Sequence, residues 1–153
     1  MEKGNFKKFK LKYKLPSTQD IEEMFEISVK DDSLVLQNIR NEIGFKAYEL
    51  MKSLESILFI HEGSDPESLF IEQMIGDIKK QVYESYKELN EIHTRASRIK
   101  CEHDRKKDAE FIKSVFKQWN GIDKKLKVVF EKIEQGWKNI EISPNNLPES
   151  YHV

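Results

Sequence analysis

Residues 8–15 alternate between basic and apolar positions, which is the pattern of a β-strand with two different faces. The apolar positions are two residues apart and comprise Phe9, Leu11, Tyr13 and Leu15. Lysines fill the positions between and before them: Lys8, Lys10, Lys12 and Lys14. A period of two places the two sets on opposite faces, and Pro16 ends the run because it lacks the N–H that a ladder needs. We therefore predict a basic, extended β-arm over residues 1–16.

Beyond this arm the apolar positions recur every three or four residues, which predicts helices. Ser17 and Thr18 offer capping oxygens to a short helix over about residues 18–29. A longer helix is expected after residues 31–33, with the apolar stripe Leu36, Ile39, Ile43, Ala47, Leu50, Leu54, Ile57 and Leu58, and should run to about Ile60. Gly44 lies inside it at a cost of about 1 kcal/mol relative to alanine, so we expect a close helix crossing there.

The segment from Pro66 to Trp119 carries a helical pattern that follows a predicted loop at residues 61–66. Its seam is typical of extended helix packing or a coiled coil and consists of Ile71, Ile75, Ile78, Val82, Tyr86, Leu89, Ile92, Ala96, Ile99 and His103. The charged stretch 102–110 contains neither Gly nor Pro. We therefore favour one continuous helix over residues 66–119, with a bend near 104–107 as the alternative.

Asn120 and Gly121 predict a helix end, because both residues tolerate the left-handed conformation. A last helix over about residues 123–140 should then fold back antiparallel, with the buried face Ile122, Leu126, Val129, Ile133, Trp137 and Ile140. The predicted fold is all-α and four-helix bundle-like, with a long αα-hairpin of coiled-coil character and a short N-terminal β-arm. The predicted divisions are the arm (1–16), a helical domain (17–140) and an extended C-terminal tail (141–153).

Composition places the chain among folded intracellular proteins. Its 153 residues suit one domain, and nine Phe, five Tyr and two Trp supply core formers. The sequence contains no apolar run of about 20 residues that could span a membrane, and no secretory signal. A single cysteine cannot form an internal disulfide. We expect a cytoplasmic protein that does not enter a membrane.

The net charge of −1 conceals a strong segregation of charge. Residues 1–16 carry six lysines and one acid, whereas residues 17–32 carry six acids and one lysine. Residues 98–140 are basic again, with twelve basic and seven acidic side chains. We interpret the basic arm as a segment that lies against an acidic surface of its own chain or of a partner.

The residues that could carry chemistry are not grouped as catalysis or metal binding requires. Neither His93 nor His103 has a second histidine or a carboxylate three or four residues away, so we expect no metal and no other cofactor. Cys101 is two residues from His103, which would place the two on different sides of a helix. The glycines are too isolated to form a phosphate-binding loop.

One short pattern resembles that of a known family. Arg98 and His103 flank four residues within a helical chain, and this Arg-x4-His arrangement resembles the motif of HEPN-type ribonucleases. The resemblance covers six residues. It implies a helical, usually dimeric protein in which the arginine steadies a phosphate and the histidine takes part in cleaving RNA. His103 also fits the apolar seam as an interior residue, so both interpretations remain.

The sequence favours a non-enzymatic protein–protein interaction module, such as an adaptor, an assembly chaperone or a small inhibitor. A lone strand needs a partner for its backbone groups, so the arm would pair with the tail, a partner or a second copy. If the seam over residues 71–103 exceeds what the first two helices can cover, another chain should bury it, and a dimer is the expected form. Two alternatives are RNA cleavage by Arg98 and His103, and nucleic-acid binding by the lysines and aromatic residues of the arm. The near-neutral charge weighs against the second.

Overall fold

The computed structural model describes residues 4–58, 76 and 78–142, and it describes side chains as far as Gln135. The described elements are all helices: α1 (Gly4–Tyr13), α2 (Thr18–Phe25), α3 (Val35–Leu58), α5 (Lys79–Lys100) and α6 (Arg105–Ile142). The all-α prediction is therefore confirmed. The predicted loop at 61–66, the first two residues of the seam and the tail beyond residue 142 lie outside the described residues. None of the helices described is long and apolar enough to cross a bilayer.

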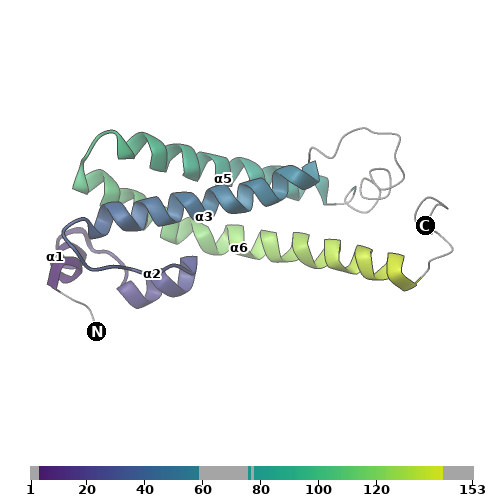
Figure 1. Cartoon of the computed structure of the whole chain (residues 1–153), viewed down its shortest axis with the longest axis horizontal. Coiled ribbons are helices and arrows are strands. Elements are labelled where there is room, and N and C mark those ends of the chain that lie inside the picture. The colour runs from purple at the N-terminus through teal and green to yellow at the C-terminus, as the bar shows by residue number, and fades with distance from the viewer. Residues whose placement is uncertain (1–3, 59–75, 77, 143–153) are drawn as a thin grey trace.

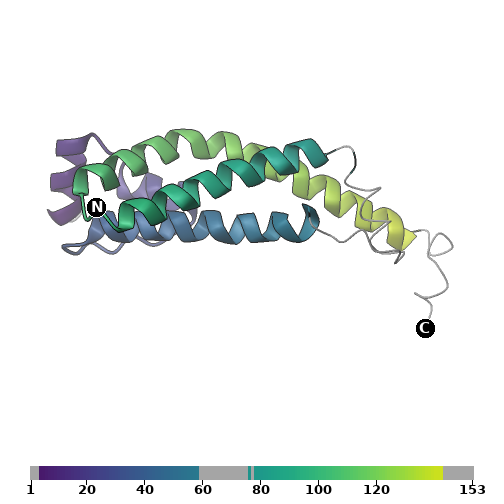
Figure 2. The ribbon, with the colours of Figure 1, turned by 90° about the horizontal axis from the view of Figure 1, so that it is seen from above.

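Three long helices, α3, α5 and α6, lie side by side and form the body of the molecule (Figure 1). The second view shows that the two short helices, α1 and α2, gather at the end of this body where α3 begins (Figure 2). The last turns of α6 extend beyond the ends of the other two long helices. Within the described residues the body thus has three helices, rather than the expected four-helix arrangement.

The predicted β-arm is a helix, which corrects the strand prediction. Phe6, Phe9 and Tyr13 recur at steps of three and four, and the two phenylalanines are buried in the core. The backbone N–H of Phe6 donates to a carboxylate oxygen of Asp31 at 2.7 Å, so a free donor at the helix start is satisfied. Leu11, which the alternating pattern placed on the apolar face, is 74% exposed. The prediction failed because it counted Leu11 and omitted Phe6, the residue that establishes the helical spacing.

The start of α2 and its packing follow from local chemistry. The side chain of Ser17 accepts the N–H of Asp20 at 3.1 Å, as expected of an N-cap. The helix ends at Phe25, earlier than predicted, because Glu26 adopts the left-handed conformation. Phe25 is fully buried, with its ring 5.1 Å from that of Trp119 in an edge-to-face arrangement. This contact holds α2 against α6.

The αα-hairpin turns at residues 101–104, between α5 and α6. His103 lies in this turn with a positive φ of 51°. Asp104 follows, and its carboxylate accepts the backbone N–H of Lys106 at 2.9 Å, which caps the start of α6. A capping aspartate and one residue in the left-handed region are therefore enough to end one helix and begin the next without glycine or proline.

The prediction from the sequence therefore misplaced this hairpin. The lack of Gly and Pro in residues 102–110 favoured a continuous helix, and Asn120 and Gly121 indicated a helix end. The continuous helix over residues 66–119 is interrupted at 101–104, close to the bend considered as the alternative. Asn120 and Gly121 lie inside α6 with helical backbone. An exposed glycine costs a helix only about 1 kcal/mol, which is less than the buried apolar side chains on both sides of it contribute.

Gly44 lies at a close approach of α3 to α5. A Cβ atom added at this position would lie 2.7 Å from the Cβ of Ala96, closer than real side chains pack. The predicted close crossing at Gly44 is confirmed. The glycine lets two backbones meet that an alanine would separate.

The seam on α5 is covered within the chain. Val82, Leu89, Ile92 and Ala96 are all buried, on a helix that packs on both α3 and α6. These described positions of the seam therefore need no second chain to cover them.

A buried ion pair joins α3 to α6 inside the core. Arg40 is 1% exposed and Asp108 is 4% exposed, and an Nη atom of the arginine lies 2.5 Å from a carboxylate oxygen. The second Nη atom donates to the side-chain oxygen of Asn41 at 2.9 Å. Burial raises the pKa of the Asp108 carboxyl, and the hydrogen bond and charge of Arg40 oppose that rise. The pair fixes how α3 and α6 are placed relative to each other.

Candidate functional site

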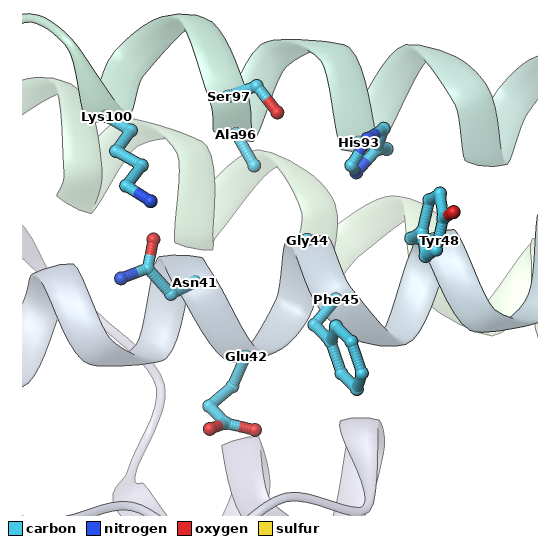
Figure 3. A pocket seen from close by; sticks show the side chains of 9 residues that line it. All are labelled: Asn41, Glu42, Gly44, Phe45, Tyr48, His93, Ala96, Ser97 and Lys100. Atoms are coloured by element: carbon cyan, nitrogen blue, oxygen red, sulfur yellow. The ribbon is translucent and has the colours of Figure 1, made fainter.

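A groove lies on the outer surface where α3 and α5 cross (Figure 3). It has a volume of about 470 Å³ and is lined by Asn41, Glu42, Gly44, Phe45, Tyr48, His93, Ala96, Ser97 and Lys100. Gly44 and Ala96, which meet closely at the helix crossing, both line the groove. The groove is therefore a feature of the helix crossing.

Two aromatic side chains of α3 form a ridge beside the groove, and we call Phe45 and Tyr48 the aromatic ridge. The ring of Tyr48 lies 5.0 Å from that of His93 across the groove. Phe45 is 59% exposed and points away from α5 (Figure 3). A second hollow of about 600 Å³ is also lined by both ridge residues. The ridge therefore borders two hollows, and its exposed apolar surface is the kind of feature that marks interaction sites.

Charged side chains of both signs flank the ridge on α3. Glu42 precedes it, and Glu49 and Lys52 follow, all three exposed. The ammonium of Lys52 lies 3.4 Å from a carboxylate oxygen of Glu55 and 5.6 Å from the centre of the Tyr48 ring. The hydrogen bond to Glu55 raises the pKa of Lys52 above its ordinary value. An apolar centre with a charged rim is typical of protein interfaces.

The groove does not present a catalytic arrangement in the part of the chain described. Its titratable side chains Glu42, His93 and Lys100 make no ion pair or hydrogen bond with one another. Nor do the described residues include a group of three or more side chains able to hold a metal ion.

The residues proposed for strand addition do not form a free surface. Phe9 and Leu15 are buried, Tyr13 is half-buried, and only Leu11 is largely exposed. The lysines of the same segment do reach the surface: Lys8, Lys12 and Lys14 are exposed and Lys10 is half-buried. Because the apolar members belong mostly to the core, this segment offers positive charge rather than an apolar edge.

Arg98 and His103, the residues of the ribonuclease-like pattern, are both exposed near the α5–α6 turn. No hydrogen bond joins their side chains in the described structure. His103 lines a hollow of about 230 Å³ together with Phe9, Arg105 and Asp108, and Arg98 does not line it. The expectation that His103 is an interior residue of a seam is wrong, and the structure instead places it beside α1.

The left-handed backbone at His103 makes a specific prediction about its role. A residue with a Cβ atom pays about 1 kcal/mol or more in this conformation, whereas glycine does not. His103→Gly should therefore leave the free energy of unfolding unchanged or increase it by up to about 1 kcal/mol. His103→Ala, which keeps the Cβ atom, should bring no such gain. Urea unfolding measures both variants.

The same variants test the ribonuclease pattern. If the wild-type protein cleaves RNA and His103→Gly is folded but inactive, the resemblance extends to activity. Absence of cleavage by the wild type would remove the catalytic interpretation of Arg98 and His103. A loss of more than 1 kcal/mol in His103→Gly would contradict the conformational argument and assign the imidazole a structural role.

The aromatic ridge was missed in the sequence, although a signal for it was present. Phe45 directly follows Gly44 and falls outside the apolar stripe that the helix over residues 35–58 buries. An aromatic residue on the polar face of an amphipathic helix is not needed to pack the core, so it can indicate an interaction surface. The sequence alone did not show that Tyr48 and His93 would meet beside it.

Comparison of the chain with family models, curated proteins and solved structures finds no match in any of the three. Function is therefore inferred from the geometry of this molecule.

Proposed function

We propose that this chain is a non-enzymatic protein-interaction module that acts through the aromatic ridge and the groove beside it. The observation that carries the proposal is Phe45, an aromatic side chain 59% exposed on a well-packed helix pair and bordered by two hollows. Aromatic anchors within a polar rim commonly supply most of the free energy of protein association. An adaptor or assembly role fits such a surface.

The charge pattern along α3 favours a second copy of the chain as the partner. Glu42 and Lys52 lie on either side of the ridge, ten residues or about 15 Å apart along the helix. Two α3 helices packed antiparallel about a two-fold axis would bring the ridges together. They would also place Glu42 of each copy opposite Lys52 of the other. Both ends of the interface would then carry opposite charges.

Sedimentation velocity over a concentration series tests self-association. The wild type should show a monomer–dimer equilibrium, and Phe45→Ser should weaken it at least tenfold because the central aromatic contact is lost, about 1.4 kcal/mol or more. Phe130→Ser is the matched control, since Phe130 is 38% exposed on α6 and does not line either hollow. A wild type that stays monomeric at every concentration would contradict the proposal.

A charge exchange tests the antiparallel geometry separately. Glu42→Lys and Lys52→Glu should each weaken the dimer, because each places like charges opposite one another. The double variant should restore association, since it recreates both pairs with their signs reversed. If the double variant does not restore association while Phe45→Ser remains defective, the ridge still mediates self-association, but the antiparallel arrangement of the two copies is rejected.

A further inference from the structure

Cations from two distant parts of the sequence gather at one end of the molecule. α1 packs on the start of α6 and lies at the same end as the α5–α6 turn in both views (Figures 1 and 2). We call the following exposed side chains the basic end: Lys7, Lys8 and Lys12 on α1, Lys14 just after it, and Arg98, Lys100, Arg105 and Lys106 around the turn. Folding thus brings together the lysines of the N-terminal segment and the basic residues of the C-terminal half.

Direct contacts make the two groups one surface. The guanidinium of Arg105 lies 5.3 Å above the ring of Phe9, so α6 and α1 are joined by a cation–π contact. Beside it, the hollow of about 230 Å³ is lined by Phe9 from α1, by Ser33 and Gln37, and by His103 and Arg105 from the turn and α6. Arg105 therefore links α1 to the basic residues around the turn.

Most acids near this surface have partners within the chain, whereas Glu110, one helical turn after Lys106, is exposed. Asp31 and Asp32 accept backbone N–H groups, of Phe6 at 2.7 Å and of Leu34 at 2.9 Å. In the turn, Asp104 caps α6, and a carboxylate oxygen of Glu102 lies 2.8 Å from the ammonium of Lys107. Asp108 is paired with Arg40 in the core.

The four exposed lysines of the N-terminal segment lack such carboxylate partners. Among the described residues, no carboxylate lies within ion-pair distance of Lys7, Lys8, Lys12 or Lys14. Several of the local acids are thus engaged within the chain, whereas these four lysines face water, although the whole chain has a net charge of −1. A surface of this kind raises the local concentration of anions and orients an approaching polyanion.

We propose that the basic end binds the phosphate backbone of double-stranded nucleic acid without reading its sequence. The cations lie on two separate elements, so a ligand that meets several of them must carry repeated negative charge. Lysine is depleted from the centres of protein interfaces, whereas lysine and arginine supply most contacts to phosphates. The chemistry therefore favours a nucleic acid over an acidic protein.

The aromatic residues favour a duplex over a single strand. Proteins that bind single strands stack bases on exposed aromatic rings. Here Phe9 is buried beneath Arg105, and Tyr13 is half-buried with its ring 6.3 Å from that of Phe9. The basic end thus offers charges for a backbone and few ring faces for bases.

Acidic side chains limit how far the duplex can extend over the protein. Asp20, Glu23 and Glu26 are exposed on or next to α2, and they would repel a backbone that crossed this helix. Contact is therefore confined to α1 and the turn. Not all eight cations can reach one duplex at once, and we expect about four phosphate contacts, which predicts a slope of log K against log salt of about −4.

Fluorescence anisotropy with a labelled duplex of about 20 base pairs, titrated over a salt series, tests the inference. The wild type should bind with a slope of about −4. Lys8→Glu/Lys12→Glu should weaken binding at least tenfold at low salt and reduce the slope by about 2. Lys79→Glu/Lys80→Glu is the matched control: it makes the same change in net charge at the opposite end of α5, about 33 Å away, and should bind like the wild type. Circular dichroism checks that both variants are folded.

Competitors distinguish the ligand classes. Unlabelled duplex should displace the probe more effectively than a single strand of equal length or than polyglutamate. The inference is overturned if the wild type binds no duplex at low salt, if the single strand or polyglutamate competes better, or if the control variant loses affinity as much as Lys8→Glu/Lys12→Glu. None of these outcomes depends on the aromatic ridge, because Phe45 lies outside the basic end.

Discussion

Replacing Asp108 with alanine should destabilise the protein by about 3–5 kcal/mol, because the change leaves Arg40 as an unpaired charge in the core. Arg40 is 1% exposed and its remaining hydrogen-bond partner is the side-chain oxygen of Asn41. An arginine cannot shed its proton at any accessible pH, so the folded state has no way to neutralise the charge. Urea unfolding at neutral pH measures the loss, and a cost below 1 kcal/mol would show that Arg40 reaches solvent.

The reciprocal variant, Arg40→Met, should be less damaging, because Asp108 can take up a proton. Burial already raises the pKa of this carboxyl, and removal of Arg40 takes away the hydrogen bond and the charge that oppose the rise. The folded state then holds the proton more tightly than the unfolded state. The stability of Arg40→Met is therefore greatest below the ordinary aspartate pKa of about 3.9 and is lost as the pH rises through the higher folded value.

Urea unfolding of Arg40→Met at several pH values checks that sign. A flat profile, or stability that increases with pH, would contradict a raised pKa of Asp108 in this variant. The double variant Arg40→Met/Asp108→Leu supplies the control, since it removes both charges from the core. It should cost less than Asp108→Ala alone and show no pH dependence from this site.

The fold was predictable where one local signal dominated. The capping oxygen of Ser17 placed the start of α2, and the apolar stripe placed α3 to within a few residues of its end at Leu58. The hairpin was misplaced because its turn uses His103 in a left-handed conformation, and histidine gives no such signal. Gly121 did give a signal for a turn, but the packing of α6 on both sides of it prevails over the local preference.

In the candidate sites, too, features that depend on neighbouring residues were predictable from the sequence, whereas contacts between distant residues were not. Arg40 falls on the apolar face of α3, between Leu36 and Ile43, so a buried charge could have been suspected from the sequence. Its partner Asp108 is 68 residues away and could not have been identified. The basic end also needed the structure, because only the packing of α1 on α6 brings its lysines beside the α5–α6 turn.

Replacing Gly44 with alanine should destabilise the protein by about 2 kcal/mol, in spite of the better helix propensity of alanine. The new Cβ atom would lie 2.7 Å from the Cβ of Ala96. Relieving such overpacking costs about 1–3 kcal/mol, and the gain in propensity of about 1 kcal/mol offsets only part of a strain at the upper end of that range. Thermal and urea unfolding of the two proteins measure the net effect.

Two further variants make this prediction specific to the helix crossing. Gly121→Ala makes the same substitution within α6 at a position with nothing within 4 Å, and it should stabilise by up to about 1 kcal/mol. Ala96→Gly should restore much of the loss when it is combined with Gly44→Ala, because the methyl group then moves from one helix to the other without adding volume. If Gly44→Ala were as stabilising as Gly121→Ala, the added Cβ atom would cause no strain, which would mean that α3 and α5 can move apart to accommodate it. The groove and its Tyr48–His93 contact would then be too loosely held to position an interface.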